Sequence, residues 1–361
     1  MKHITLALLL IICNVSTAKN KEQSTVNFNE TYELANIILA LTEYGRIDRN
    51  EINKQTKYYQ DVIAYFAPVS NHPILDRANY SREKWDKLLS FRTDAVAFAF
   101  NKKQQLKRIH QFYSMSKEIN EFESNIDFIQ DFVEKSNFRE FYILKKPYFD
   151  SLALLYEQSL MINEVVLFLE NEFDVKSRSK QRIIVSPLVG RMHCQRHFNK
   201  LSTSFINIPE HIYNVENINQ IIKEKLASGV HMFFTEIDHD FVNPVTNKFK
   251  KMYLQNFDQC KWDRESGYGE WEMGVFNEYM TWAVYDVFIY TNFPDVSDTL
   301  TKQWHEVNAS RGFFVSEMFG GKLLELYKEK GGNIKIIDLY PDMLKWCKQV
   351  ENNLDKLKNT Q

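Results

Sequence analysis

Glycine and proline are scarce in this chain of 361 residues, which contains 11 and 8 of them. This disfavours an all-β sandwich, because the tight turns of that architecture draw heavily on both residues, and it disfavours long flexible linkers. Charge of one sign is not in excess: 45 lysines and arginines stand against 47 aspartates and glutamates, which gives a formal net charge of −2. Without a basic surplus to neutralise phosphates, no nucleic acid is expected as a partner.

Cysteine is also rare, and its spacing is irregular. No Cys-x-x-Cys zinc knuckle occurs, and the three cysteines beyond the N-terminal segment, Cys194, Cys260 and Cys347, are not the even set of a disulfide framework. In an oxidising compartment they allow one bridge and one free thiol, and the sequence does not select the pair. A Gly-rich phosphate loop and a Gly-x-Ser-x-Gly elbow are absent as well, so neither motif points to nucleotide binding or to a serine hydrolase.

The N-terminus carries the pattern of an export signal. A short basic start precedes an apolar run at residues 4–15, and small residues ending at Ala18 follow, where a signal peptidase reads them. The run is shorter than the roughly 20 apolar residues of a membrane span. We therefore predict a signal peptide at residues 1–18, a secreted or periplasmic mature protein and no membrane span.

Apolar residues make up 44% of the chain and recur at helical spacing through its first half. Leu34, Ile37, Ile38 and Leu41 fall at positions i, i+3, i+4 and i+7, which is one face of a helix. Similar patterns predict helices over residues 58–66, 81–100, 125–135, 139–158 and 163–173.

The pattern changes near residue 180. Residues 182–188 and 203–208 are predicted to be short strands, and residues 334–339 another. A helix is expected over residues 215–226, with Gly229 ending it. We predict an α+β, predominantly helical protein with an N-terminal helical region at residues 19–180 and a second region at residues 181–361.

The stretch Thr-Glu-Ile-Asp-His-Asp at residues 235–240 contains the main candidate residues for metal binding and catalysis. On a helix that ends near Pro244, its apolar residues share one buried face: Phe233, Phe234, Ile237 and Phe241. Glu236 and His239 then project together from another face. This is the geometry of the second half of the zinc motif His-Glu-x-x-His, in which two histidines hold the ion and the glutamate acts on its water. Thr235 stands where the first histidine would be.

A second acidic residue lies downstream, in an aromatic helix predicted over residues 270–290. Glu278 follows Asn277 there, between Phe276 and Trp282. A carboxylate in such surroundings is costly to bury without a metal or a hydrogen-bonding partner. Together with the Glu-x-x-His stretch, it indicates a metal site between two apolar helices.

These residues resemble an uncharacterised secreted bacterial family, catalogued as domain of unknown function 4932 and placed among the gluzincin-like zinc metallopeptidases. The matching parts are residues 34–44, 58–66, 72–73 and 94–96, then Glu236, His239, residues 243–244 and residues 277–278. The resemblance implies a zincin-like peptidase core in residues 181–361. It also implies that His239 and Glu278 are metal ligands, that Glu236 is the catalytic general base, and that zinc or another divalent metal is the cofactor.

Threonine at position 235 cannot supply the imidazole that the family pattern expects. His231 lies eight residues before His239, about 12 Å along a helix, which is too far for the same ion. His193 and His197 are candidate replacement ligands, with surface histidines as the alternative interpretation. Glu236 itself is a third candidate, and two carboxylates with one imidazole would be less selective for zinc.

Hydrolysis also requires a donor that stabilises the oxyanion or contacts the substrate. The candidates by sequence neighbourhood are Tyr279, Tyr285, His305 and Arg311. We predict a secreted metal-dependent hydrolase, a gluzincin-like metallopeptidase that acts on a peptide or protein substrate. The alternative is a catalytically inactive protein of the same fold that binds a peptide, a glycan or a protein partner. The absent histidine favours the alternative, and the two glutamates beside His239 favour the enzyme.

Overall fold

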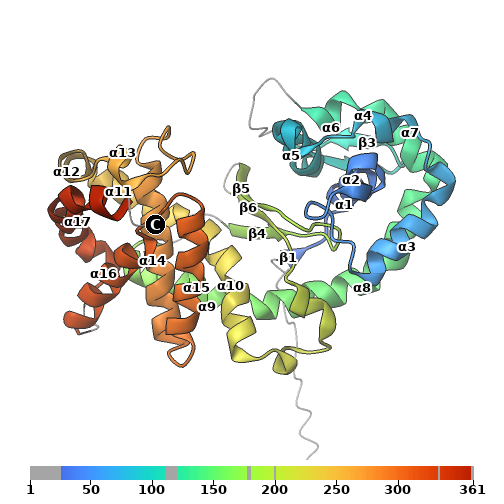
Figure 1. Ribbon diagram of the computed structural model, residues 1–361. Coiled ribbons are helices and arrows are strands. Elements are labelled where there is room, and N and C mark those ends of the chain that lie inside the picture. The colour runs from blue at the N-terminus through green and yellow to red at the C-terminus, as the bar shows by residue number, and fades with distance from the viewer. Residues whose placement is uncertain (1–25, 111–119, 177–179, 199–200, 332–333, 359–361) are drawn as a thin grey trace, which may run out of the picture.

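The computed structural model describes residues 26–110, 120–176, 180–198, 201–331 and 334–358. Within these ranges the chain is predominantly helical, with one four-stranded sheet and one small hairpin, which confirms the α+β prediction at that level. An N-terminal and a C-terminal lobe of helices lie on either side of the sheet (Figure 1). The predicted signal peptide at residues 1–18 lies outside the described residues.

The N-terminal lobe is built around α1 (Glu30–Leu41). Asn29 caps this helix by accepting a hydrogen bond from the backbone N–H of Tyr32 at 2.9 Å, and every later residue of the helix is buried. The elements around it are α2 (Glu43–Ile47), α3 (Lys57–Tyr65), η1 (Ala67–Val69), α4 (Pro73–Arg77), η2 (Arg82–Lys84), α5 (Trp85–Thr93), η3 (Asp94–Ala97), β2 (Phe98–Phe100), β3 (Leu106–Arg108), α6 (Glu121–Ser124) and α7 (Ile126–Ser136).

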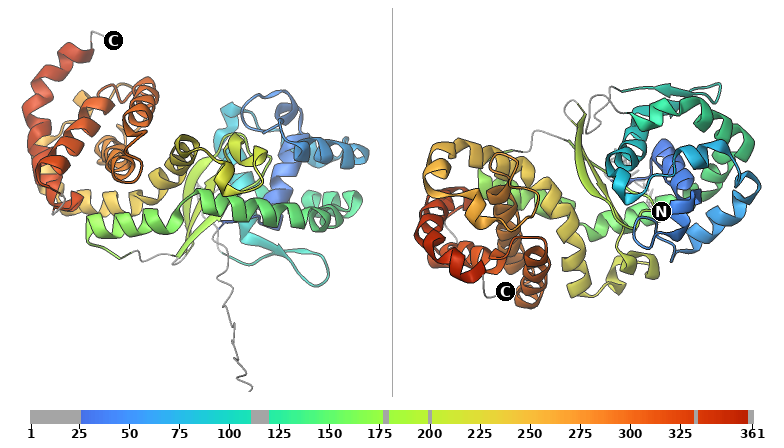
Figure 2. Two further views of the ribbon diagram at one scale, coloured as in Figure 1. Left: turned by 90° about the horizontal axis from the view of Figure 1, so that it is seen from below. Right: turned by 45° about the horizontal axis from the view of Figure 1, so that its top comes forward.

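Two helices, α8 (Phe138–Ser159) and α9 (Ile162–Phe173), run along one side of the molecule from lobe to lobe (Figure 2). Up to Phe149, α8 packs into the N-terminal core, and from Leu152 onward α8 and α9 pack into the C-terminal core. By length and composition alone, residues 138–173 form a helical stretch long and apolar enough to cross a membrane. Here some of its apolar side chains pack into the two protein cores, whereas Ile143, Leu144, Leu154 and Leu167 are exposed. The absence of a membrane span and the region boundary at residue 180 stay predictions.

The sheet has the order β1-β4-β6-β5, with bounds β1 (Val26–Asn27), β4 (Lys180–Ile184), β5 (His193–Phe198) and β6 (Leu201–Ile206). β1, β4 and β6 are parallel, whereas β5 is an antiparallel edge strand. Side chains alternate between the faces of a strand. Ile183 and Ile206 therefore join the core of the C-terminal lobe, while Ile184 and Phe205 pack against α1 and α5.

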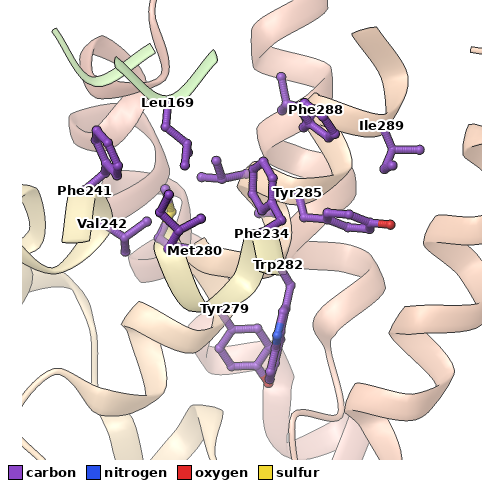
Figure 3. Close-up of a cluster of buried hydrophobic side chains, with 14 of the residues drawn as sticks. Leu169, Phe234, Phe241, Val242, Tyr279, Met280, Trp282, Tyr285, Phe288 and Ile289 are labelled. Atoms are coloured by element: carbon purple, nitrogen blue, oxygen red, sulfur yellow. The ribbon is translucent and has the colours of Figure 1, made fainter. Parts of the chain in front are cut away.

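The C-terminal lobe surrounds α14 (Gly274–Asn292), which is buried almost throughout. Figure 3 shows its side chains packed between α9, α10 and α11. A helix that is apolar on all sides belongs in the middle of a core. The other elements are η4 (Glu210–Asn214), η5 (Ile218–Gln220), α10 (Lys223–Ile237), α11 (His239–Lys248), α12 (Lys250–Asn256), α13 (Gln259–Trp262), α15 (Ser297–Ser310), α16 (Ser316–Glu329) and α17 (Ile336–Lys358).

Three predicted elements differ from the structure. The helix expected at residues 215–226 begins instead at Lys223 and continues through Gly229 as α10. Pro244 lies inside α11 and does not end it. The strand expected at residues 334–339 is wrong as well, because α17 begins at Ile336.

Candidate active site

The helical stretch that carries Glu236 and His239 is fixed by its apolar face. Phe233, Phe234 and Ile237 are fully buried, and Phe241 nearly so, as the sequence predicted. Asp238 alone separates α10 from α11, and its carbonyl accepts hydrogen bonds from the next turn at 2.8 Å. The polar side of the same stretch therefore turns Glu236 and His239 away from the core.

His239 and Glu278 meet across α11 and α14. The Nε2 atom of His239 lies 3.4 Å from Oε1 of Glu278. Its Nδ1 atom lies 3.5 Å from Asn243 Oδ1 and 3.5 Å from Thr281 Oγ1. A histidine that ligates a metal through one ring nitrogen usually has the other held in this way. The two helices thus bring together the imidazole and the carboxylate that the sequence singled out.

Glu236 forms a second pair, with His193 of the edge strand β5. Cys194 packs with the cluster on the far face of the sheet, so His193 faces α10. Its Nε2 atom lies 2.9 Å from Glu236 Oε1 and 2.9 Å from the carbonyl oxygen of Met232. Both partners are acceptors, so this nitrogen carries a proton and donates it.

The two members of this pair shift each other's pKa. Burial alone favours the neutral imidazole, but the adjacent carboxylate outweighs it and raises the pKa of His193. Burial alone likewise favours the protonated acid, but the imidazole outweighs it and lowers the pKa of Glu236. Glu236 is therefore held as a carboxylate, which is the form that a general base requires.

A further carboxyl group lies behind these pairs. Asp238 is fully buried, beside Glu278 and the side chain of Thr281. Burial, and then the neighbouring Glu278, raises its pKa well above the ordinary range. Burial also raises the pKa of Glu278. The fold therefore favours the protonated forms of these two acids, and a cation bound beside them would favour their charged forms instead.

Aromatic and basic residues form the adjoining wall. The guanidinium of Arg311 lies over the ring of Trp282, 5.4 Å from its centroid, and hydrogen-bonds to the hydroxyl of Tyr268. His231 stacks on Trp304 with ring centroids 3.6 Å apart, so it belongs to this wall and not to the metal motif. Arg311 also helps to hold down the pKa of Glu278, which places its charge close to the site.

The remaining predicted contacts belong to the core. Tyr279 donates to the carbonyl of Trp262 at 3.0 Å, and Tyr285 donates to the carbonyl of Ala227 at 3.1 Å. His305 lies between Asp286 and Ser316, with both ring nitrogens in contact at 3.0 and 2.9 Å. These three side chains use their polar atoms inside the protein, which corrects the expectation that they contact a substrate.

Two further expectations concern residues 197 and 235. The backbone of His197 lies in β5 opposite Ser202, and its side chain is outside the described part of the structure. Thr235 is buried, and its hydroxyl donates to the carbonyl of His231 at 3.0 Å within the same helix.

None of the three cysteines within the described residues, Cys194, Cys260 and Cys347, forms a disulfide with another described residue. Burial raises the pKa of Cys194 to about 12, and it raises that of Cys347 well above the ordinary range. Neither is a thiolate ligand at neutral pH.

As the side chains stand, no three His, Cys, Asp or Glu residues within the described ranges are close enough to share one metal ion. The donors instead form two closed pairs, His193–Glu236 and His239–Glu278. The donor set still suits a divalent cation, because it offers two imidazoles and two carboxylates with the buried Asp238 behind them. A bound cation would take the place of the protons that these pairs now hold.

Comparison with models of protein families, with curated proteins and with solved structures finds no match to this chain. The function of the protein is therefore inferred from the residues of the site and their geometry.

Sequence reasoning missed Tyr268 and Trp304, which come from segments with no motif. Asp238 lies inside the Glu-x-x-His stretch, and its spacing of two residues from Glu236 places it on another side of the helix, where it is buried.

Proposed function

We propose that this chain is an exported, metal-dependent hydrolase with a gluzincin-like core, and that peptide bonds are its substrate. The observation that carries the proposal is the meeting of two histidine–carboxylate pairs from β5, α10–α11 and α14 beside the buried carboxyl group of Asp238. A cluster of titratable groups with shifted pKa values is a common mark of catalytic sites.

His239 and Glu278 would hold the cation, and His193 would take the position that Thr235 does not fill. The cation would supply Lewis acidity and a water of lowered pKa. Glu236, kept as a carboxylate by His193, would accept a proton from the attacking water and deliver it to the leaving amine. Asn243 and Thr281 keep the imidazole of His239 oriented, with Nε2 facing Glu278.

The position of β5 supports a peptide substrate. This strand borders the site through His193, and among the described strands only β6 pairs with it. Its outer edge offers backbone donors and acceptors to an extended chain, which is a recurring mode of peptide recognition.

Metal content and hydrolysis together test the proposal. Full-length protein expressed with added zinc should contain about one zinc per chain by mass spectrometry, and chelation should abolish cleavage of a mixed peptide library. Glu278→Ala should remove the metal and the activity. Glu272→Ala, which alters an exposed glutamate just before α14, should preserve both.

The inactive binding protein is the second candidate, and one observation favours it: the pairs are closed, and position 235 carries no imidazole. A metal-free protein under zinc-replete conditions that retains peptides without cleaving them would exclude the hydrolase and support this candidate.

A further inference from the structure

We propose that Arg311 is the binding site for a free carboxylate of the substrate, so that peptides with a carboxylate near the scissile bond are preferred. This inference deepens the proposed function and rests on it for the position of the scissile bond. Three features of the structure support it: a close backbone contact fixes Arg311, an aromatic ring orients its side chain, and no ion pair among the described residues neutralises its charge.

The turn that carries Arg311 is pinned to the loop before α14. Gly312 has a φ of +100°, and its carbonyl accepts a hydrogen bond from the N–H of Arg264 at 2.9 Å. A Cβ atom at this position would lie 2.4 Å from the carbonyl oxygen of Arg264 and 2.8 Å from the nitrogen of Ser266, so only glycine allows this approach. Arg311 is thus anchored at the end of α15 by a close backbone contact.

Trp282 then orients the side chain. Its ring contacts Phe313 edge-on, with centroids 4.5 Å apart, and the guanidinium of Arg311 lies over it at 5.4 Å. Trp282 follows Glu278 by four residues on α14, which corresponds to the same helix face and about 6 Å along the axis. The guanidinium therefore lies near the carboxylate that we assign to the metal, whose pKa its charge also lowers.

The charge of Arg311 is left available. The residue is exposed, and among the described residues its side chain forms no ion pair, although three carboxylates lie in the adjoining site. It lies over the ring of Trp282 and beside the hydroxyl of Tyr268. A guanidinium placed over an aromatic ring keeps N–H donors for a carboxylate, which it can bind through two hydrogen bonds.

The position of Arg311 beside the assigned metal site restricts which carboxylate fits. A carboxylate bound there belongs to a residue close to the scissile bond along an extended peptide. The C-terminal carboxylate of a short peptide meets this condition, and so does an aspartate or glutamate side chain at that position. In both cases the recognised group is a carboxylate.

Three sets of N-acetylated tetrapeptides distinguish these sources: one with a free C-terminal carboxylate, one amidated, and one amidated but containing an aspartate or glutamate. Wild-type protein should cleave at least one carboxylate-bearing set about tenfold faster than the neutral amides, a ratio expected for one charged hydrogen-bonding contact. Arg311→Gln should bring the ratio close to one, and Arg311→Lys should give an intermediate value. Arg77→Gln removes another arginine that lies over an aromatic ring, and it should leave the ratio unchanged.

A binding measurement separates this inference from the proposed function. The Glu236→Gln protein, incubated with the same sets and recovered by ultrafiltration, should retain carboxylate-bearing peptides about tenfold over the neutral amides. The preference should disappear when Arg311→Gln is added. Retention without cleavage by wild type would uphold the carboxylate site and reject the hydrolase. Cleavage or retention with no preference for a carboxylate would overturn the inference, whatever becomes of the hydrolase.

Discussion

Gly320 and Gly321 of α16 are neighbours that should respond to alanine in opposite ways. A Cβ atom on Gly320 would lie 2.1 Å from Oδ2 of Asp286 and 2.8 Å from Cε1 of His305, whereas a Cβ atom on Gly321 has nothing within 4 Å. Asp286 and His305 form a buried ion pair at 3.0 Å, and the imidazole also contacts Ser316 at 2.9 Å. The glycine at position 320 therefore makes room for a link between α14, α15 and α16.

The expected magnitude follows from this geometry. Unstrained contacts of this kind need roughly 3.5 Å, so Gly320→Ala must push the Asp286 carboxylate aside by more than about 1 Å. Overpacking costs about 1–3 kcal/mol, and separating a buried ion pair costs about 3–5 kcal/mol. Alanine recovers about 1 kcal/mol of helix propensity. Both costs describe the same displacement of Asp286, so they are not added. Taking the ion-pair cost and subtracting the gain in helix propensity, we expect the free energy of unfolding to fall by roughly 2–4 kcal/mol.

Gly321→Ala is the matched control, because it gains the same helix propensity without the collision. It should raise the free energy of unfolding by up to about 1 kcal/mol. Urea titrations followed by circular dichroism measure both variants under one set of conditions. If Gly320→Ala were neutral or stabilising like its neighbour, the packing of Asp286 and His305 against α16 would be refuted.

Two further predictions concern the N-terminal core and the metal motif. Glu33 is fully buried, accepts a hydrogen bond from Tyr58 at 2.8 Å, and has its pKa raised by burial from 4.5 to about 7. The folded chain binds this proton more tightly than the unfolded chain, so the free energy of unfolding should fall as the pH rises from about 4.5 to about 7. Glu33→Gln should remove roughly 2–4 kcal/mol of that dependence in urea titrations at pH 5 and pH 8, and an unchanged pH profile would contradict the assignment. Thr235→His adds an imidazole four residues before His239 and should raise zinc affinity at least about tenfold in competition with a chelating dye; unchanged affinity would show that position 235 does not face the metal.

The centre of the site could be predicted because its information is local. Glu236 and His239 share a short stretch whose apolar residues fix its orientation, and all four of those residues are buried as expected. Glu278 stood out as an acid among aromatic residues. The partner of Glu236 could not be chosen in this way. His193 and His197 looked equivalent in the sequence, and only the position of β5 along α10 brings His193 to Glu236.

The errors in secondary structure share one cause, which is tertiary packing that outweighs a local signal. Gly229 costs α10 about 1 kcal/mol of helix propensity, but the helix continues because Val230, Phe233 and Phe234 are fully buried. Pro244 removes one backbone hydrogen bond from α11, and Val242 and Val245 on either side of it are buried in the same core. Residues that alternate like a strand after position 334 instead lie at the start of α17.

The passage of α8 through both cores has a mechanical consequence. Phe149 is embedded in one core and Leu152 in the other, so less than one helical turn separates the two anchors. Swinging the lobes apart would require breaking the backbone hydrogen bonds of this short span. The helix is therefore a rigid connection, and the two lobes keep a fixed distance from each other. Any bending is expected to concentrate at Pro147, where α8 already lacks one backbone hydrogen bond.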